Sequence, residues 1–288
     1  MFLGAGTTLG NTPFDGRRVP SEARGGSALY SRSSASLNAN VVDRADLTPA
    51  TWKVWLKPDG AYQFKPGQYS TIGASGIERA YSIASAPEDP LIELFIKLVP
   101  PPLGALTPVL HAMDEGDVVS IRPRAKGLLT LDRAYRTHLM VSTGTGVAPF
   151  VSILRDYLAR GTDDDFEFHV LQGSDCRYEL GYDAELAEMA ERSSRIHYTP
   201  TLGLPQAACN DGWNGSGGRV NEILDDYVRA HGLDPATTLA YACGHPGMIA
   251  DVKSRLIPRG WSVKEERFWK PVNGAQAGPN TANLEPAS

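Results

Sequence analysis

A strand, a glycine-rich turn and a helix follow one another in residues 138–161, which read HLMVSTGTGVAPFVSILRDYLARG. The apolar residues after Pro149 recur at helical spacing and predict an amphipathic helix, with Pro149 in its first turn and Gly161 at its end. Gly144 and Gly146 in the turn would let a phosphate approach the free N–H groups where the helix begins. A plain strand-to-helix connection explains the same glycines, so this motif alone leaves both interpretations open.

The two parts of the chain, before and after the start of this unit, differ in their pattern of strand and helix signals. From residue 138 onwards, strand-like runs alternate with helix-like runs, as in FEFHVLQ followed by YDAELAEMAERS, which predicts a parallel sheet with crossover helices. Residues 38–133 instead hold short β-type runs separated by turn signals, which predicts a small antiparallel barrel. The expected fold class is α+β with two domains, an N-terminal antiparallel β-barrel followed by an α/β domain.

Composition sets the domain limits. Residues 1–36 are rich in Gly, Ser and Arg without an apolar period, so we expect a disordered tail, although an Arg- and Ser-rich start also resembles a transit peptide. The barrel is expected at residues 37–134, the α/β domain at 135–270 and a flexible tail at 271–288.

Charge and hydropathy exclude several classes of protein. The net charge of −5 argues against a general nucleic-acid surface. No run approaches ~18 uninterrupted apolar residues, so no membrane span is expected. The first residues lack the basic flank and apolar stretch of a secretory signal, which makes the cytoplasm the expected compartment.

Cysteines and histidines give no sign of a metal centre. Cys176, Cys209 and Cys243 lie far apart in the sequence, so we expect reduced thiols and neither a disulfide framework nor a metal knuckle. Three thiols cannot hold a plant-type iron–sulfur cluster, which needs four, so any such cluster would belong to a separate protein. The histidines have no i, i+4 partner and no nearby cysteine at ligand spacing, and no metal is expected.

Four motifs occur in one order along the chain. They are RAYS at residues 79–82, LGALT at 103–107, TGTGVAP at 143–149 and CGHPGM at 243–248. This series resembles the ferredoxin–NADP⁺ reductase superfamily, and within it the bacterial ferredoxin reductases, whose motifs are Arg-x-Tyr-Ser, Gly-x-Leu-Thr, Gly-Thr-Gly-x-Ala-Pro and Cys-Gly-x-Pro-x-Met. The resemblance covers about residues 37–269.

The resemblance implies bound FAD in the barrel. Arg79 would bind the diphosphate, a role that suits a planar, bidentate guanidinium. Tyr81 would lie against the isoalloxazine ring, and Ser82 would hydrogen-bond near its N5 atom. A second diphosphate contact would come from Gly104, Leu106 and Thr107. Taken alone, Arg79 is better explained as a surface charge and Tyr81 as a half-buried strand aromatic, and only the order of the motifs favours the flavin roles.

The resemblance also implies an NAD(P) site and a hydride path. The nucleotide would contact Gly144, Thr145, Gly146 and Gly244. Cys243 would stand beside the nicotinamide, where its small side chain lets C4 approach flavin N5; a buried structural cysteine is the alternative. Glu266 would be a proton-relay acid.

Two aromatic residues follow this acid in the sequence. By the resemblance, Phe268 would cover the flavin ring and Trp269 its adenine, although an amphipathic surface strand end explains the same segment. The continuation of the chain beyond Trp269 departs from the pattern of the bacterial reductases.

The choice of coenzyme depends on the segments after two strands. Relatives that use NADPH commonly hold its 2′-phosphate with an Arg after the second strand of the nucleotide domain and a Ser/Thr-Arg pair after the next. Here Asp175 and the sequence TLGL at 201–204 stand at those positions. A carboxylate repels a phosphate and accepts a hydrogen bond from a free ribose hydroxyl, so NADH is favoured. Arg177 and Arg219 could still hold a 2′-phosphate, and Asp175 could be a helix N-cap.

The resemblance implies a ferredoxin–NAD(P)⁺ reductase, a flavoprotein expected to be a monomer whose partner is ferredoxin or another iron–sulfur electron carrier. An acidic ferredoxin would suit a basic rim near the flavin. The alternatives are the reductase component of a multicomponent oxygenase and a flavin-binding electron-transfer subunit that is not active alone. The candidate rim residues are Arg122, Arg124, Lys126, Arg133, Arg136, Lys253, Arg255, Arg259, Lys264 and Arg267.

Overall fold

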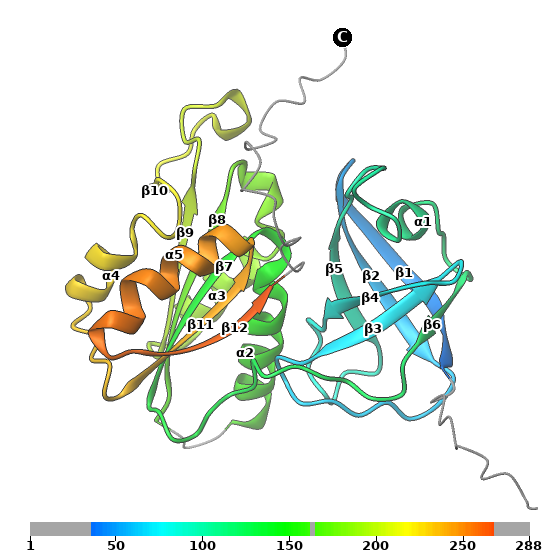
Figure 1. Ribbon diagram of the computed structural model, residues 1–288, viewed down its shortest axis with the longest axis horizontal. Helices are drawn as coiled ribbons and strands as arrows, with labels where there is room; N and C mark the ends of the chain where they lie inside the picture. The colour runs from blue at the N-terminus through cyan, green and yellow to red at the C-terminus, as the bar shows by residue number, and fades with distance from the viewer. Residues whose placement is uncertain (1–35, 162–164, 268–288) are drawn as a thin grey trace, which may run out of the picture. The chain divides into compact units, whose positions relative to one another are not determined.

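The computed structural model describes residues 36–161 and 165–267, which contain two six-stranded sheets (Figure 1). The strand order is β4-β3-β6-β1-β2-β5 in the first, antiparallel sheet and β10-β9-β8-β7-β11-β12 in the second, parallel sheet. The expected fold class, an antiparallel β-domain followed by an α/β domain, is confirmed.

The first sheet curls around an apolar core but closes only weakly. Its edge strands meet through a single bridge between Ile83 and Leu94, so the barrel is incomplete. Trp52 and Ile72 are among the fully buried side chains of its core. Its elements are β1 (Leu37–Thr48), β2 (Thr51–Pro58), β3 (Tyr69–Ala74), β4 (Ile77–Ser82), β5 (Ile92–Lys97), α1 (Thr107–His111) and β6 (Val118–Ile121).

Helices cover both faces of the parallel sheet. Alternate residues of a strand point to opposite faces, so Met140 packs with α2 and α3, whereas Leu139 and Val141 pack with α4 and α5, which lie together on one face in Figure 1. The strands are β7 (Thr137–Thr143), β8 (Glu167–Ser174), β9 (Ile196–Leu202), β10 (Ser216–Gly217), β11 (Thr238–Gly244) and β12 (Ser262–Arg267). The helices are α2 (Ala148–Arg160), α3 (Asp183–Arg192), α4 (Leu224–Ala230) and α5 (Pro246–Leu256).

Local signals account for the limits of α2. Pro149 lies in its first turn, and the helix ends at Gly161, which adopts a left-handed conformation with φ of 53°. Both positions agree with the sequence prediction, because proline lacks a donor that the first turn does not need and glycine tolerates positive φ.

The order of the parallel strands creates a switch point between β7 and β11. From β7 the chain proceeds outwards through β8, β9 and β10, and it then returns to β11 on the other side of β7. Ligands of open α/β sheets bind outside the carboxyl ends of the strands at such a point. The glycine-rich turn at residues 143–149 and the CGHPGM motif at 243–248 lie at these two strand ends.

The cysteine expectation is wrong for two of the three residues. Cys176 and Cys209 form a disulfide with Cα atoms 5.8 Å apart, and only Cys243 is a free thiol. The two cysteines are 33 residues apart in the sequence, so the sequence does not indicate that they are neighbours. They meet because the segment after β9 folds back onto the end of β8. The Asn210 side chain fastens this fold by donating to the carbonyl oxygens of Asp175 and Leu204.

A buried carboxylate joins the cores of the two sheets. Glu93 of β5 is 4% exposed and accepts hydrogen bonds from Arg155 of α2 and from the Tyr182 hydroxyl, each at 2.6 Å. Arg155 also holds Glu185 of α3 with two hydrogen bonds, at 2.6 and 2.9 Å. The α/β domain is therefore attached to the first sheet by a charged, hydrogen-bonded cluster rather than by apolar contact alone.

The two expected tails, residues 1–36 and 271–288, lie outside the described residues except for Ser36. Among the helices of the described part, none has the length and apolar character needed to cross a membrane.

Candidate active site

Three predicted site residues, which come from distant parts of the sequence, meet where β4, β11 and β12 end. The Ser82 hydroxyl donates to Glu266 Oε1 at 3.2 Å, and Glu266 lies directly beside Cys243 in the parallel pairing of β12 with β11. A Cβ atom on Gly127 would lie 3.0 Å from Glu266 Oε2. The flavin-side motif and the nucleotide-side motif thus meet at one carboxyl group.

The environment of Glu266 changes its acidity. Burial raises the pKa of Glu266 from its ordinary value of 4.5 to about 7, and the hydrogen bond from Ser82 opposes this shift. A carboxyl group with a pKa near 7 exchanges protons readily at neutral pH. The geometry and the acidity together suit the proton-relay role predicted for this residue.

The glycine-rich turn packs against the end of β11 at backbone level. A Cβ atom on Gly146 would come within 2.4 Å of the Cys243 carbonyl oxygen, and one on Gly244, at φ of 131°, within 2.3 Å of Thr143 Oγ1. The Thr143 hydroxyl accepts a hydrogen bond from the His245 N–H at 2.9 Å. By contrast, a Cβ atom on Gly144 would meet nothing within 4 Å, so the outer side of the turn is open to a ligand.

Cys243 is a protonated, buried thiol. It is 1% exposed, and burial raises its pKa well above the usual range, with the nearby Glu266 carboxylate adding to the shift. A neutral thiol is a weak nucleophile, which fits a packing role at the end of β11 rather than covalent catalysis.

The remaining residues of the RAYS motif present both a cation and an aromatic ring. Arg79 is exposed, and its guanidinium donates one hydrogen bond within the described residues, to the Glu78 carbonyl oxygen at 2.7 Å. Other guanidinium donors are therefore available to a ligand. Tyr81 is half-buried and packs against the core of the first sheet, where burial raises its pKa.

The LGALT motif forms a tight turn before α1. Gly104 is required there, because a Cβ atom would overlap the Val99 carbonyl oxygen. The Thr107 hydroxyl accepts from the Val99 N–H and donates to its carbonyl oxygen, both at 3.0 Å, and is not a helix cap. Leu106 is buried in the same apolar core against which Tyr81 packs.

The side chains that are expected to contact the ribose lie close together after the ends of β8 and β9. A Cβ atom on Gly203 would lie 2.9 Å from the Asp175 carboxylate and 3.7 Å from the Arg219 side chain. Asp175 is exposed and has no side-chain partner within the described residues. The short helix at residues 177–179 has Cys176, not Asp175, at its N-cap, which disfavours the N-cap alternative. Arg177 is exposed too, with its guanidinium 6.0 Å from the Trp213 ring.

Two predicted site residues lie outside the described residues, and one further residue at the site belongs to none of the sequence motifs. Phe268 and Trp269 fall outside the described residues. No sequence motif points to Gly127. A Cβ atom at this position would lie 3.0 Å from Glu266 Oε2 and 3.1 Å from the Tyr69 ring. The only signal for it is a glycine just after the antiparallel bridge of Lys126 with Tyr69.

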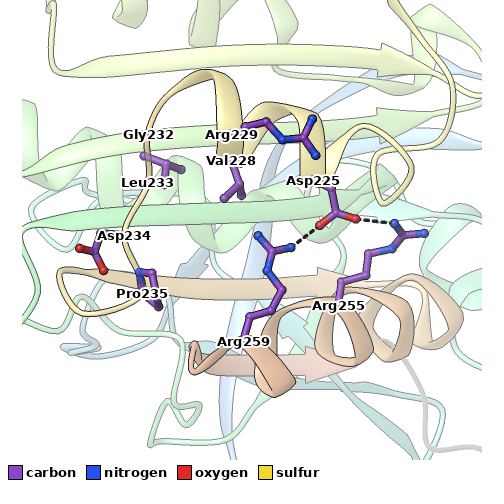
Figure 2. A pocket seen from close by; sticks show the side chains of 9 residues that line it. All are labelled: Asp225, Val228, Arg229, Gly232, Leu233, Asp234, Pro235, Arg255 and Arg259. Carbon is purple, nitrogen blue, oxygen red and sulfur yellow. Dashed lines mark hydrogen bonds and ion pairs between the residues drawn. The ribbon is translucent and has the colours of Figure 1, made fainter.

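Much of the expected basic rim is paired with carboxylates. In the pocket shown in Figure 2, Asp225 lies between Arg255 and Arg259 and bonds to both. The hydrogen bond from Arg255 lowers the pKa of Asp225 most, and the bond from Arg259 lowers it further. None of the residues that line this pocket belongs to the predicted flavin or nucleotide sites. Further ion pairs join Arg122 to Glu78, Arg136 to Asp165, Lys253 and Arg267 to Glu265, and Lys264 to Asp132. Arg124 and Lys126, by contrast, are exposed, and Lys126 directly precedes Gly127, whose Cβ position lies 3.0 Å from Glu266 Oε2.

Comparison with known proteins agrees with this geometry. Residues 140–254 match the family model of the oxidoreductase NAD-binding domain. The chain is 30% identical to the phenol hydroxylase P5 protein of Acinetobacter pittii over 249 residues, which cover 82% of this chain and 67% of the relative. It is 33% identical to ferredoxin–NADP reductase B of Sorangium cellulosum over 216 residues, 71% of this chain and 83% of the relative.

A solved structure is similar over nearly its whole length. The ferredoxin NADP⁺ reductase of Neisseria gonorrhoeae, determined with bound FAD and NADP, superposes with a TM-score of 0.71 at 25% identity and covers 81% of this chain and 98% of that one. Sequence similarity, the order of the two sheets and the meeting of Ser82, Cys243 and Glu266 all lead to one assignment. The chain belongs to the ferredoxin–NADP reductase family of oxidoreductases.

Proposed function

We propose that the chain is an FAD-dependent reductase that exchanges hydride with NAD(P)H and passes single electrons to a separate iron–sulfur protein. The observation that carries this proposal is the meeting of Ser82, Glu266 and Cys243 at the carboxyl end of β11. The flavin-loaded chain should reduce ferricyanide with NADH or NADPH. A yellow protein that is inactive in this assay would instead favour an electron-transfer subunit.

The residues present fit FAD. Arg79 offers unpaired donors for the diphosphate, and we assign Gly104, Leu106 and Thr107 to the second diphosphate contact. Tyr81 would lie against the ring, and Phe268 and Trp269 would stack on flavin and adenine. When bound, FAD accepts a hydride from the nicotinamide and releases its electrons one at a time.

The nucleotide domain orients the nicotinamide. The open turn at Gly144, Thr145 and Gly146 would bind the pyrophosphate, and Gly244 continues the same surface. Because Gly146 touches the Cys243 backbone, the turn and the thiol keep a fixed spacing. The small, buried thiol of Cys243 would leave room for a bound nicotinamide, and its buried surroundings would keep water away from the reacting atoms.

Arg79→Ala is expected to weaken FAD binding by about 1.5–3 kcal/mol, because a charge-assisted hydrogen bond to a phosphate is lost. Equilibrium dialysis of the apoprotein with FAD measures the effect. Arg124→Ala removes another exposed arginine of the first domain and should leave the affinity unchanged. Equal FAD affinities for Arg79→Ala and wild type would contradict the assignment.

Glu266→Gln should change how stability depends on pH. An acid whose pKa rises from 4.5 unfolded to about 7 folded binds more protons in the folded state between these values. Glu266 therefore adds to the free energy of unfolding. This contribution is fully present below the pKa of the unfolded state and is lost as the pH rises through the pKa of the folded state. Urea unfolding between about pH 4.5 and 7 should show the wild type losing stability relative to Glu266→Gln. Parallel curves would show that Glu266 has an ordinary pKa.

We propose NADH as the preferred coenzyme. Asp175 lies beside Gly203, where its carboxylate would repel a 2′-phosphate and accept a hydrogen bond from a 2′-hydroxyl. Arg219 and Arg177 lie in the same neighbourhood and oppose this preference. Asp175→Arg is expected to shift the ratio of kcat/KM for NADH over NADPH by about tenfold or more towards NADPH, which corresponds to about 1.4 kcal/mol. Glu191→Arg, the same type of charge change at an exposed acid near the end of helix α3, is the control. A wild type that strongly prefers NADPH would overturn the proposal.

The second candidate is the reductase component of an oxygenase. The 30% identity to the phenol hydroxylase P5 protein over 82% of this chain favours it. The two functions differ in the electron acceptor, so rates with ferredoxin and with an oxygenase component distinguish them. We propose a cytoplasmic monomer with functional domains at residues 37–134 and 135–270.

A further inference from the structure

Two histidines and a glutamate gather at the end of the parallel sheet that is opposite to the nucleotide site. Glu167 and His169 lie at the start of β8, and His197 lies at the start of β9. Residues two apart on a strand face the same side, and the parallel register pairs His169 with His197. The three side chains therefore point into one place, at the ends of the strands remote from Cys243.

The three potential ligand atoms are close enough to share one ion. His197 Nε2 lies 3.0 Å and His169 Nε2 3.3 Å from Glu167 Oε1, and all three ligand atoms lie within 4.8 Å of one another. Ligands about 2.0–2.1 Å from a tetrahedral ion are roughly 3.3 Å apart. A small rearrangement of the two exposed side chains would complete such a geometry.

The buried imidazole is held as a metal ligand would be. His169 is 1% exposed, and its Nδ1 atom lies 2.9 Å from the Tyr227 hydroxyl. Its Nε2 atom is buried and makes no hydrogen bond within the described residues, although it faces the Glu167 carboxylate. A ligating histidine commonly donates its second ring N–H to a neighbouring oxygen, which fixes the ring and leaves the other nitrogen free for the metal.

We propose that Glu167, His169 and His197 bind a divalent transition-metal ion of the Zn²⁺ class. Two imidazoles and one carboxylate match the ligands that zinc prefers. The Glu167 and His197 side chains are 45% and 36% exposed, so the ion reaches the site from solvent and water supplies the fourth ligand.

The ion would connect β8 to β9 through its ligands and reach α4 through Tyr227, whose ring is stacked on His231 with centroids 3.9 Å apart. This inference is independent of the proposed redox function, because its residues belong to the opposite end of the sheet.

Calorimetric titration of the EDTA-treated, untagged full chain with Zn²⁺ tests the proposal. We expect one equivalent to bind. His197→Ala and Glu167→Gln should each lower the affinity by more than the roughly 10–100-fold that follows loss of an outer partner. Tyr227→Phe, which removes only the hydroxyl that positions His169, should lower it by about 10–100-fold. A wild type that binds Zn²⁺ no more tightly than His197→Ala would overturn the site and leave a hydrogen-bonded cluster only.

A matched control separates this site from adventitious binding to histidines. His111 is the last residue of α1 in the first domain and contacts the Pro49 carbonyl oxygen at 3.2 Å, so His111→Ala should retain full affinity. Co²⁺ in place of Zn²⁺ should give ligand-field absorption of a four-coordinate ion in wild type and His111→Ala and none in His197→Ala. Equal losses in the two alanine variants would reject the assignment.

Discussion

Replacement of Arg155 by alanine is expected to lower the free energy of unfolding by about 3–5 kcal/mol, the usual cost of removing one partner of a buried ion pair. The loss would leave Glu93, 4% exposed, without its cation. The effect should exceed that of any surface ion pair, because an uncompensated buried carboxylate has no water to solvate it.

The hydrogen-bond geometry around Arg155 supports this magnitude. Burial alone would lower the pKa of Arg155, but its hydrogen bonds to Glu185 and Glu93 outweigh that effect and raise it. The guanidinium also donates to the Ala84 carbonyl oxygen at 3.1 Å, and the neighbouring Ser152 hydroxyl donates to the Ser85 carbonyl oxygen at 2.7 Å. Helix α2 is thus bonded to the first sheet at several points, and removal of the guanidinium affects all contacts of this cluster.

Urea unfolding of the variant and of a matched control measures the effect. Arg160, on the same helix, forms an ion pair with Asp156 at 2.8 Å, and its side chain is 54% exposed, so Arg160→Ala should cost less than about 1 kcal/mol. In the double variant Arg155→Ala/Glu93→Ala the buried Glu93 carboxylate is removed together with its cation, and the loss should be smaller than the sum of the two single losses. If Arg155→Ala behaves like Arg160→Ala, the cluster does not hold the domains together.

Features that depend on local sequence were predicted well. The limits of α2 follow from Pro149 and Gly161, because proline and glycine act on their own backbone whatever the tertiary structure. The place of Cys243 at a strand end follows from an apolar run that is broken by glycine. These signals are complete within a few residues.

Features that depend on pairing between distant segments could not be predicted. Glu93 and Arg155 look like ordinary charges in the sequence, and only packing of β5 against α2 makes them a buried pair. The expectation of no metal site rested on helical spacing, which cannot detect His169 and His197, because these become neighbours only through the parallel register of β8 and β9. Strand register is a tertiary property and was not available from one sequence.

Loss of the Cys176–Cys209 disulfide is expected to lower the free energy of unfolding by about 3–4 kcal/mol, the chain-entropy value for a closed loop of this length. The loop spans 33 residues, and the open chain would gain that conformational freedom when unfolded. Cys176→Ser/Cys209→Ser and wild type, each with and without dithiothreitol, give the measurement by urea unfolding. The reductant should destabilise the wild type and leave the double variant unchanged. Equal stability of oxidised and reduced wild type would show that the bond contributes nothing.

The same bond should affect coenzyme binding, because it holds the segment that frames Asp175. Asn210, next to Cys209, donates to the Asp175 carbonyl oxygen at 2.8 Å and accepts from the Arg177 N–H at 2.8 Å. Release of this segment would free the side chains that we propose for ribose binding, so KM for NADH should rise, while FAD affinity should stay constant because no residue proposed for FAD lies in this segment. An unchanged KM in Cys176→Ser/Cys209→Ser would show that the hydrogen bonds of Asn210 are sufficient to hold Asp175 in place.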